Sequence, residues 1–222
     1  MAQKEKDTAS SKLSDYIGKN KKVIIIAGIV IIAGVLVFTL VNLIGNKVKS
    51  KNLNALDQIE NSYVSDIASL EGDELKAKQD EVLKSLEAYT GKSGVVGTRA
   101  NMLSAEIAFA SENYDSAVKF YEAATKQKKV YTAPVVYYNA GVCYEKLGMN
   151  DKAEEAYKTA ASFEDFVLYA HAMFSYGRIL EAEGKVEDAV KVYTELNDKQ
   201  PNDEWAKIAK TRIIALQLTV AE

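Results

Sequence analysis

A repeat with a period of 36 residues constrains the fold of this chain more than any other feature of its sequence. Each unit carries a small residue, an alanine twelve positions later and a tyrosine four positions after that. The three sets are Ala105, Ala117 and Tyr121; Gly141, Ala153 and Tyr157; and Gly177, Ala189 and Tyr193. Self-similarity at a fixed period of about 20 to 50 residues is typical of proteins that stack one structural unit. We therefore predict a stack of three such units over residues 98–201.

Each unit is predicted to be a pair of helices. Pro134 and Pro201 are the two prolines of the chain, so long stretches can be helical and we predict an all-α fold. The small residue midway along the first helix lets the second helix cross closely, and a turn of Glu-Asn or glycine separates them. The tyrosine lies on the same face as the alanine before it, and we expect its ring to fill the space between neighbouring units.

This pattern resembles the tetratricopeptide repeat. The second unit matches the signature positions of the family with Tyr137, Gly141, Tyr144, Gly148, Ala153, Tyr157 and Ala160. The first unit has Ala105 in place of the glycine, the third has Leu196 in place of the last alanine, and Pro201 matches the closing proline. The usual period of the family is 34 residues, so we expect two additional residues in the connections between units.

The resemblance implies a protein-binding groove, because the first helix of each tetratricopeptide unit lines the concave surface of the stack. The corresponding residues are Arg99, Met102, Glu106, Phe109, Val135, Tyr138, Val142, Glu145, His171, Phe174, Arg178 and Glu181. Such a surface suits an extended or helical peptide with apolar side chains and some positive charge. The alternative is that flanking helices cover some of these positions. A known subclass grips C-terminal carboxylates with Lys, Arg and Asn, but Met102, Glu106 and Ser175 stand at those positions and Asn139 alone matches.

An uncharged run of 22 residues, 23–44, precedes the repeats. As a helix rising about 1.5 Å per residue it is long enough for a hydrocarbon core of about 30 Å, so we predict a transmembrane helix. The alternatives are a buried core helix and a cleaved signal peptide. Six lysines precede the run and three follow it, which places the N-terminus in the cytoplasm. Ala27 and Gly34 lie on one face that could pack against another membrane helix, although such residues are common in membrane helices generally.

The remaining segments complete the predicted organisation. Residues 1–22 form a basic tail, and residues 45–97 form juxtamembrane helices and a degenerate first hairpin, with a break at Glu71-Gly72-Asp73. Residues 202–222 form a capping helix through Trp205 and Leu216, with Asn202 or Asp203 as its N-cap. A stack of repeats needs such caps because its end faces would otherwise be exposed.

No catalytic, cofactor or metal site is predicted, and we expect no small-molecule substrate. Gly91-Lys92-Ser93 lacks the earlier glycine of a phosphate-binding loop, since position 86 is leucine, and fits a turn between helices. The single histidine, His171, and the single cysteine, Cys143, have no accompanying motif. Residues 53–222 hold 19 of the 28 basic residues but 28 of the 31 acidic ones, and this acidity argues against nucleic-acid binding.

Topology and repeats together resemble the YfgM-like ancillary subunits of the bacterial SecYEG translocon. The resemblance implies one helix in the bacterial inner membrane, a periplasmic repeat domain, and a role in handing secreted polypeptides to periplasmic chaperones. Translocon subunits, chaperones or unfolded clients would be the partners, with no cofactor. Two other functions stay open: a scaffold that assembles a cell-envelope complex, and an organelle import receptor whose repeats lie in the cytosol.

Overall fold

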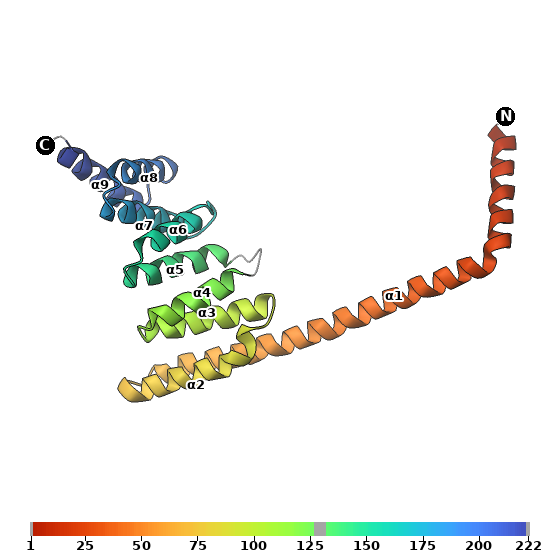
Figure 1. The fold of residues 1–222 in the computed structure, drawn as a ribbon, viewed down its shortest axis with the longest axis horizontal. Helices are drawn as coiled ribbons and strands as arrows, with labels where there is room; N and C mark the ends of the chain where they lie inside the picture. Colours follow the sequence, from red (N-terminus) through yellow and green to blue (C-terminus); the bar gives the residue numbers. More distant parts are fainter. Residues whose placement is uncertain (1, 127–131, 221–222) are drawn as a thin grey trace. The chain divides into compact units, whose positions relative to one another are not determined.

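The computed structural model describes residues 2–126 and 132–220, and every regular element in these ranges is an α-helix (Figure 1). The chain divides into two compact units, Met1–Lys51 and Asn52–Glu222. The helices are α1 (Ala2–Ile67), α2 (Gly72–Thr90), α3 (Val95–Ala110), α4 (Tyr114–Thr125), α5 (Ala133–Lys146), α6 (Asn150–Ala161), α7 (Tyr169–Ala182), α8 (Val186–Lys199) and α9 (Glu204–Val220). The predicted all-α fold is confirmed.

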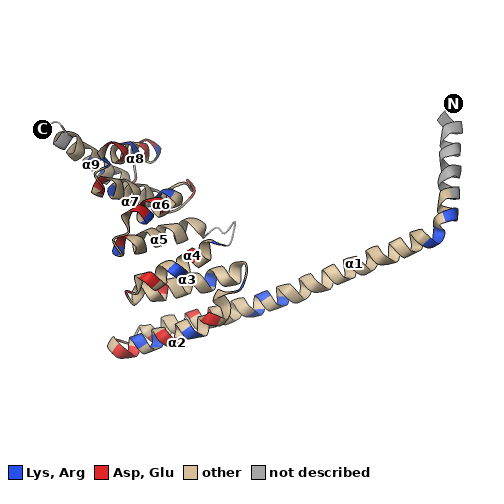
Figure 2. Cartoon of the chain, in the orientation of Figure 1, with Lys and Arg blue, Asp and Glu red and all other residues tan. Residues whose placement is uncertain are grey.

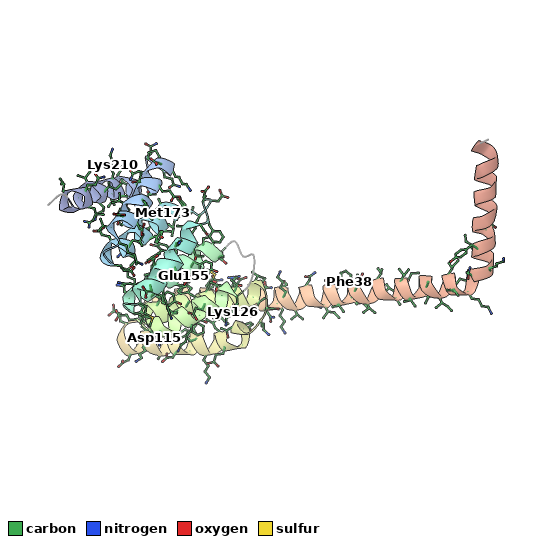
Figure 3. All side chains as sticks on the ribbon, turned by 45° about the horizontal axis from the view of Figure 1, so that its top comes forward. Phe38, Asp115, Lys126, Glu155, Met173 and Lys210 are labelled. Atoms are coloured by element: carbon green, nitrogen blue, oxygen red, sulfur yellow. The ribbon has the colours of Figure 1, made fainter. Side chains whose placement is uncertain are left out.

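Helix α1 contains the uncharged run, and the large apolar side chains of this run are exposed. Phe38, labelled in Figure 3, is 71% exposed. Among the described residues, α1 is the one helix long and apolar enough to cross a membrane, by length and composition. The two polar side chains of the uncharged run bond within the helix: Thr39 Oγ1 donates to the Val35 carbonyl at 2.8 Å and Asn42 Nδ2 to the Phe38 carbonyl at 2.9 Å. Such back-bonding leaves few polar groups that need water.

The predicted boundaries are not the boundaries of helices. Helix α1 runs through residues 22 and 44, residue 97 lies inside α3, and residue 201 lies between α8 and α9. The division into tail, span, juxtamembrane segment, repeats and cap therefore stays a prediction about function. The predicted break near Gly72 is present, because α1 ends at Ile67 and α2 begins at Gly72.

Helices α3 to α8 form three hairpins that follow one another along the stack in Figure 1. Their interior is one apolar core, in which Ala117, Ala153 and Ala189 are fully buried. Met173, also labelled in Figure 3, belongs to the same core. The predicted solenoid of helical hairpins is confirmed.

The glycines of the first helices allow the closest contacts in this core. A Cβ placed on Gly141 would lie 2.8 Å from Cδ1 of Tyr157, and one on Gly177 would lie 2.4 Å from Cε1 of Tyr193. Each ring thus lies against the first helix of its own hairpin. The glycine leaves room for the ring within the unit, and that the same rings also fill the space between neighbouring units stays a prediction.

The turns inside the three hairpins share one backbone conformation. Glu112, Gly148 and Gly184 have φ values of 58°, 69° and 75°. The residue after each turn donates its N–H to a carbonyl five residues back, as in Asn113 to Ala108 at 2.8 Å and Met149 to Tyr144 at 2.9 Å. This is the Schellman ending, in which glycine is favoured because it has no Cβ. The Glu-Asn turn therefore carries a side chain where the other units have none.

Both ends of the stack are covered by helix. Leu56 and Tyr63 of α1, with Val82 and Leu86 of α2, pack on α3 as a second apolar cluster. At the other end, Asp203 Oδ1 accepts the Trp205 N–H at 2.8 Å, so Asp203 is the N-cap of α9. Gly91-Lys92-Ser93 lies between α2 and α3, as predicted.

We predict that Glu112→Gly stabilises the repeat region by about 0.5–1 kcal/mol, because it removes a left-handed side chain at a turn that otherwise uses glycine. Urea unfolding of the full-length protein in detergent micelles, followed by circular dichroism, measures this. The matched variant Gly148→Ala should lower stability by about 1 kcal/mol. A loss of stability in Glu112→Gly, or no change in either variant, would contradict the role of this backbone conformation.

We also predict that Gly177→Ala destabilises the fold by about 1–3 kcal/mol, although alanine is the better helix former. The new methyl group meets the fully buried ring of Tyr193, which has no free space to occupy. The same unfolding assay tests this, and the penalty should shrink in a Tyr193→Leu background. If Gly177→Ala lowered the free energy of unfolding equally in both backgrounds, contact with the Tyr193 ring would not be the cause.

Candidate protein-binding groove

The twelve predicted groove residues lie on α3, α5 and α7 at four equivalent positions of the repeat. These positions are 99, 135 and 171; 102, 138 and 174; 106, 142 and 178; and 109, 145 and 181. The structure therefore places each residue on the predicted helix of its unit. Their neighbours differ from unit to unit, and these differences decide which residues remain available to a partner.

Helix α1 engages the first position of α3. Arg99 donates from Nη1 to Asp57 Oδ1 at 2.6 Å and from Nη2 to Glu60 Oε2 at 2.8 Å. The two carboxylates raise the pKa of Arg99 further above its usual value. Arg99 is thus already paired with acidic groups from the N-terminal end of the stack.

Helices α5 and α7 are joined by a two-point ion pair. Arg178 Nη1 and Nη2 donate to the two carboxylate oxygens of Glu145 at 2.7 and 2.6 Å. The Tyr157 hydroxyl donates to Glu145 at 3.0 Å. The hydrogen bonds from Arg178 are the main reason that the pKa of Glu145 is lowered. Paired carboxylate and guanidinium groups of this geometry hold each other's orientation.

Helix α9 covers the groove positions of the third unit. Arg212 donates to both carboxylate oxygens of Glu181. The Trp205 ring stacks on His171 with centroids 3.8 Å apart and planes 6° apart, and lies 5.1 Å from the Phe174 ring. The alternative considered from the sequence, that flanking helices cover part of the groove, therefore applies to this end.

Tyr138 and Phe174 are core residues more than groove residues. They are 8% and 9% exposed. The Tyr138 hydroxyl lies 2.9 Å from His171 Nδ1, and the Tyr138 ring packs on Tyr157. Met102, Val135 and Val142 are only partly buried and keep an open surface. The surface left for a partner thus lies mainly on α3 and α5.

The junction of α3 and α5 differs from the others because Phe109 and Val142 stand where the next junction has Glu145 and Arg178. Beside them is a hollow of about 210 Å³. Its lining residues are Glu106, Phe109, Tyr121, Asn139 and Val142. We call it the α3–α5 pocket. Tyr121 lines this pocket but was not among the predicted groove residues. The sequence does contain a signal for it: Tyr121 corresponds to Tyr157 of the next unit, whose hydroxyl donates to Glu145, but the residue that corresponds to Glu145 in the first unit is Phe109.

Glu106 gives the α3–α5 pocket its charge. Its side chain is exposed at the rim, and no hydrogen bond or ion pair joins its carboxylate to another described residue. The pKa of Glu106 is raised, first by partial loss of water and then by the charge of Glu60. A carboxylate in these surroundings gains from a nearby cation.

Two other features offer less to a ligand. A hollow of about 320 Å³ lies between α4, α5 and α6, but there the Tyr144 hydroxyl donates to Glu122 at 2.6 Å and Lys152 lies over the Tyr144 ring. Burial raises the pKa of the Cys143 thiol to about 12, so it stays protonated. In the described part of the chain, no three His, Cys, Asp or Glu side chains gather as a metal site.

We predict that the fluorescence of Trp205, the single tryptophan, reports the protonation of His171. Burial above all, and then Arg178, lower the pKa of His171 below its ordinary value of 6.5. The unfolded chain therefore binds this proton more readily, and the stability from neutral His171 is full above pH 6.5 and lost as the pH falls toward the folded pKa. A protonated imidazole should quench the stacked indole, so emission should titrate with a midpoint below 6.5. His171→Phe should abolish the titration; a midpoint unchanged in that variant would refute the assignment.

The comparisons with known proteins agree with this architecture. A family model described as "Tetratricopeptide repeat" matches residues 102–166 and 138–204. A "TPR repeat-containing protein" of Treponema pallidum (strain Nichols) is 32% identical over 151 residues, which are 66% of this chain and 63% of that protein. The chain therefore spans less than two thirds of the length of this relative.

Two solved structures are similar to part of this chain. The crystal structure of MamA is 21% identical over 70% of this chain and 86% of its own, with a TM-score of 0.46. The Arabidopsis OM64 TPR domain is 19% identical over 53% of this chain and 94% of its own, with a TM-score of 0.45. The matched residues coincide with the hairpins α3 to α8 and their 36-residue register, so residues 102–204 match the tetratricopeptide repeat in both sequence and structure.

Proposed function

We propose that this protein is a membrane-anchored, non-enzymatic module that binds other proteins through its groove. Tetratricopeptide-repeat domains as a class bind peptides or proteins. The observation that carries the proposal is the open surface along α3 and α5. There, partly buried apolar side chains such as Met102 and Val142 lie beside the carboxylate of Glu106, which has no hydrogen bond or ion pair with another described residue. Apolar anchors with a few polar groups suit an extended or helical peptide.

The apolar run of α1 supports anchorage in the bacterial inner membrane. Figure 2 shows lysines near both ends of this run, with more of them in the sequence before it than after it. Because the side with more positive charge stays in the cytoplasm, the N-terminus is assigned to the cytoplasm and the repeats to the periplasm. The acidic composition of residues 53–222 fits an exported domain that does not bind nucleic acid.

The finer proposal concerns the Sec translocon. A short basic tail, one membrane helix and a periplasmic repeat domain with a terminal helix are the arrangement of the YfgM-like ancillary subunits. On this basis the protein would stand beside the translocation channel and help pass emerging polypeptides to periplasmic chaperones. An assembly scaffold of the cell envelope would use the same groove for one permanent partner.

The test is in-cell photocrosslinking of the full-length protein in a Gram-negative host. The photoreactive residue replaces Met102, which is partly exposed on α3, whereas Tyr138 is buried and bonded to His171. The matched control places it at Lys158, which is exposed on α6 outside the groove. Captured proteins are then identified by mass spectrometry.

We expect Met102 to capture translocon subunits, periplasmic chaperones and varied secreted chains, and Lys158 to capture few of them. One constant envelope protein at Met102 would favour the scaffold. Capture of cytosolic proteins alone would reverse the assigned orientation, and identical products from both positions would overturn the groove as the binding surface.

A further inference from the structure

The ion pairs between successive first helices of the stack follow one order. The acid comes from the earlier helix and the arginine from the later one. Asp57 and Glu60 of α1 meet Arg99 of α3, Glu145 of α5 meets Arg178 of α7, and Glu181 of α7 meets Arg212 of α9. We call these contacts the arginine ladder. Within the described residues, each junction except that of α3 with α5 has such a step.

At the α3–α5 junction both members of the step are replaced by apolar groups. Phe109 occupies the position of Glu145, and Val142 occupies the position of Arg178. The result is the α3–α5 pocket and not a filled contact. The pocket has no internal arginine, but Glu106, which lies one turn before Phe109 on α3, provides a carboxylate at its rim.

The lining of this pocket provides separate surfaces for the two parts of an arginine side chain. Phe109 and Val142 offer apolar contact to a methylene stem or to the face of a guanidinium group. Glu106 offers two acceptor oxygens, and Asn139, whose side chain is hydrogen-bonded with Tyr121, lies in the same lining. Glu60, whose charge acts on Glu106, adds to the negative potential even though Arg99 partly neutralises it.

We propose that the α3–α5 pocket binds one arginine side chain of the partner polypeptide. That arginine would form, at this junction, the acid–arginine contact that the other junctions of the arginine ladder make within the chain. This deepens the proposed protein-binding function and rests on it. Arginine fits better than lysine because its planar group both stacks on an aromatic ring and meets a carboxylate with two hydrogen bonds. A neutral apolar side chain would leave the carboxylate of Glu106 beside it without a partner.

The test selects ligands from a random library of 12-residue peptides displayed on phage, with the full-length protein in lipid nanodiscs as bait. Three baits are compared: the native protein, Glu106→Gln, and the control Glu87→Gln, which changes an exposed carboxylate on α2. Glu106 makes no hydrogen bond or ion pair within the described fold, so Glu106→Gln should leave the thermal melt unchanged. Selected peptides are then measured by fluorescence anisotropy.

We expect arginine to be enriched in peptides selected by the native protein and by Glu87→Gln, and this enrichment to disappear with Glu106→Gln. For one selected peptide, replacing its arginine by glutamine should weaken binding about tenfold to the native protein. The same replacement should change little with Glu106→Gln, because the two groups act as one pair.

The failures are distinguishable. Enriched peptides without arginine, or an arginine effect that persists in Glu106→Gln, would overturn the arginine pocket and leave the protein-binding groove standing. Equal enrichment of lysine and arginine would also overturn it, because it would show attraction by charge alone. Enrichment of no peptide by any bait would count against the groove itself.

Discussion

The repeat region depends on the close contact between a glycine and a tyrosine within a hairpin. In the second unit the Tyr157 ring occupies the space that a side chain at Gly141 would take. This fixes the ring and brings its hydroxyl to Glu145, three angstroms away on the same helix as the glycine. Glu145 in turn holds Arg178 from the next unit. Packing inside one hairpin thus orients the charged group that joins it to the next.

The third unit repeats this sequence of contacts with the capping helix as its neighbour. Gly177 accommodates Tyr193, the Tyr193 hydroxyl donates to Glu181, and Glu181 accepts from Arg212 of α9. The first unit departs from it at three points, with Ala105 for the glycine, Phe109 for the glutamate and Val142 for the arginine of the next unit. Two of these changes, Phe109 and Val142, line the α3–α5 pocket.

Much of this fold could be predicted from the sequence, because helices and turns follow from local residues and a fixed period. The spacing of Gly141 and Tyr157, and the glycines at 148 and 184, mark helix crossings and turns directly. Contacts between side chains from different units could not be predicted in the same way. Helical periodicity puts Tyr157 on an inward face but does not say which neighbouring helix its ring will meet.

The sequence alone also could not show which groove residues are free to contact a partner. Whether Arg99 faces a partner or is already paired depends on Asp57 and Glu60, which lie 42 and 39 residues earlier in the chain. The same holds for His171, which Trp205 covers from α9. Such contacts depend on the side chains at the junction of two helices, and the repeat pattern describes only what the units have in common.

The arginine ladder is better suited to setting the register of helices than to stabilising them. Ion pairs with exposed side chains contribute about 0–1 kcal/mol each, and the side chains of Arg178 and Glu145 are 42% and 32% exposed. A missing step therefore costs the fold little, since the apolar core runs on through α3, α4 and α5 without it. A junction of this kind can lose its internal pair and gain a binding pocket while the stack around it keeps its geometry.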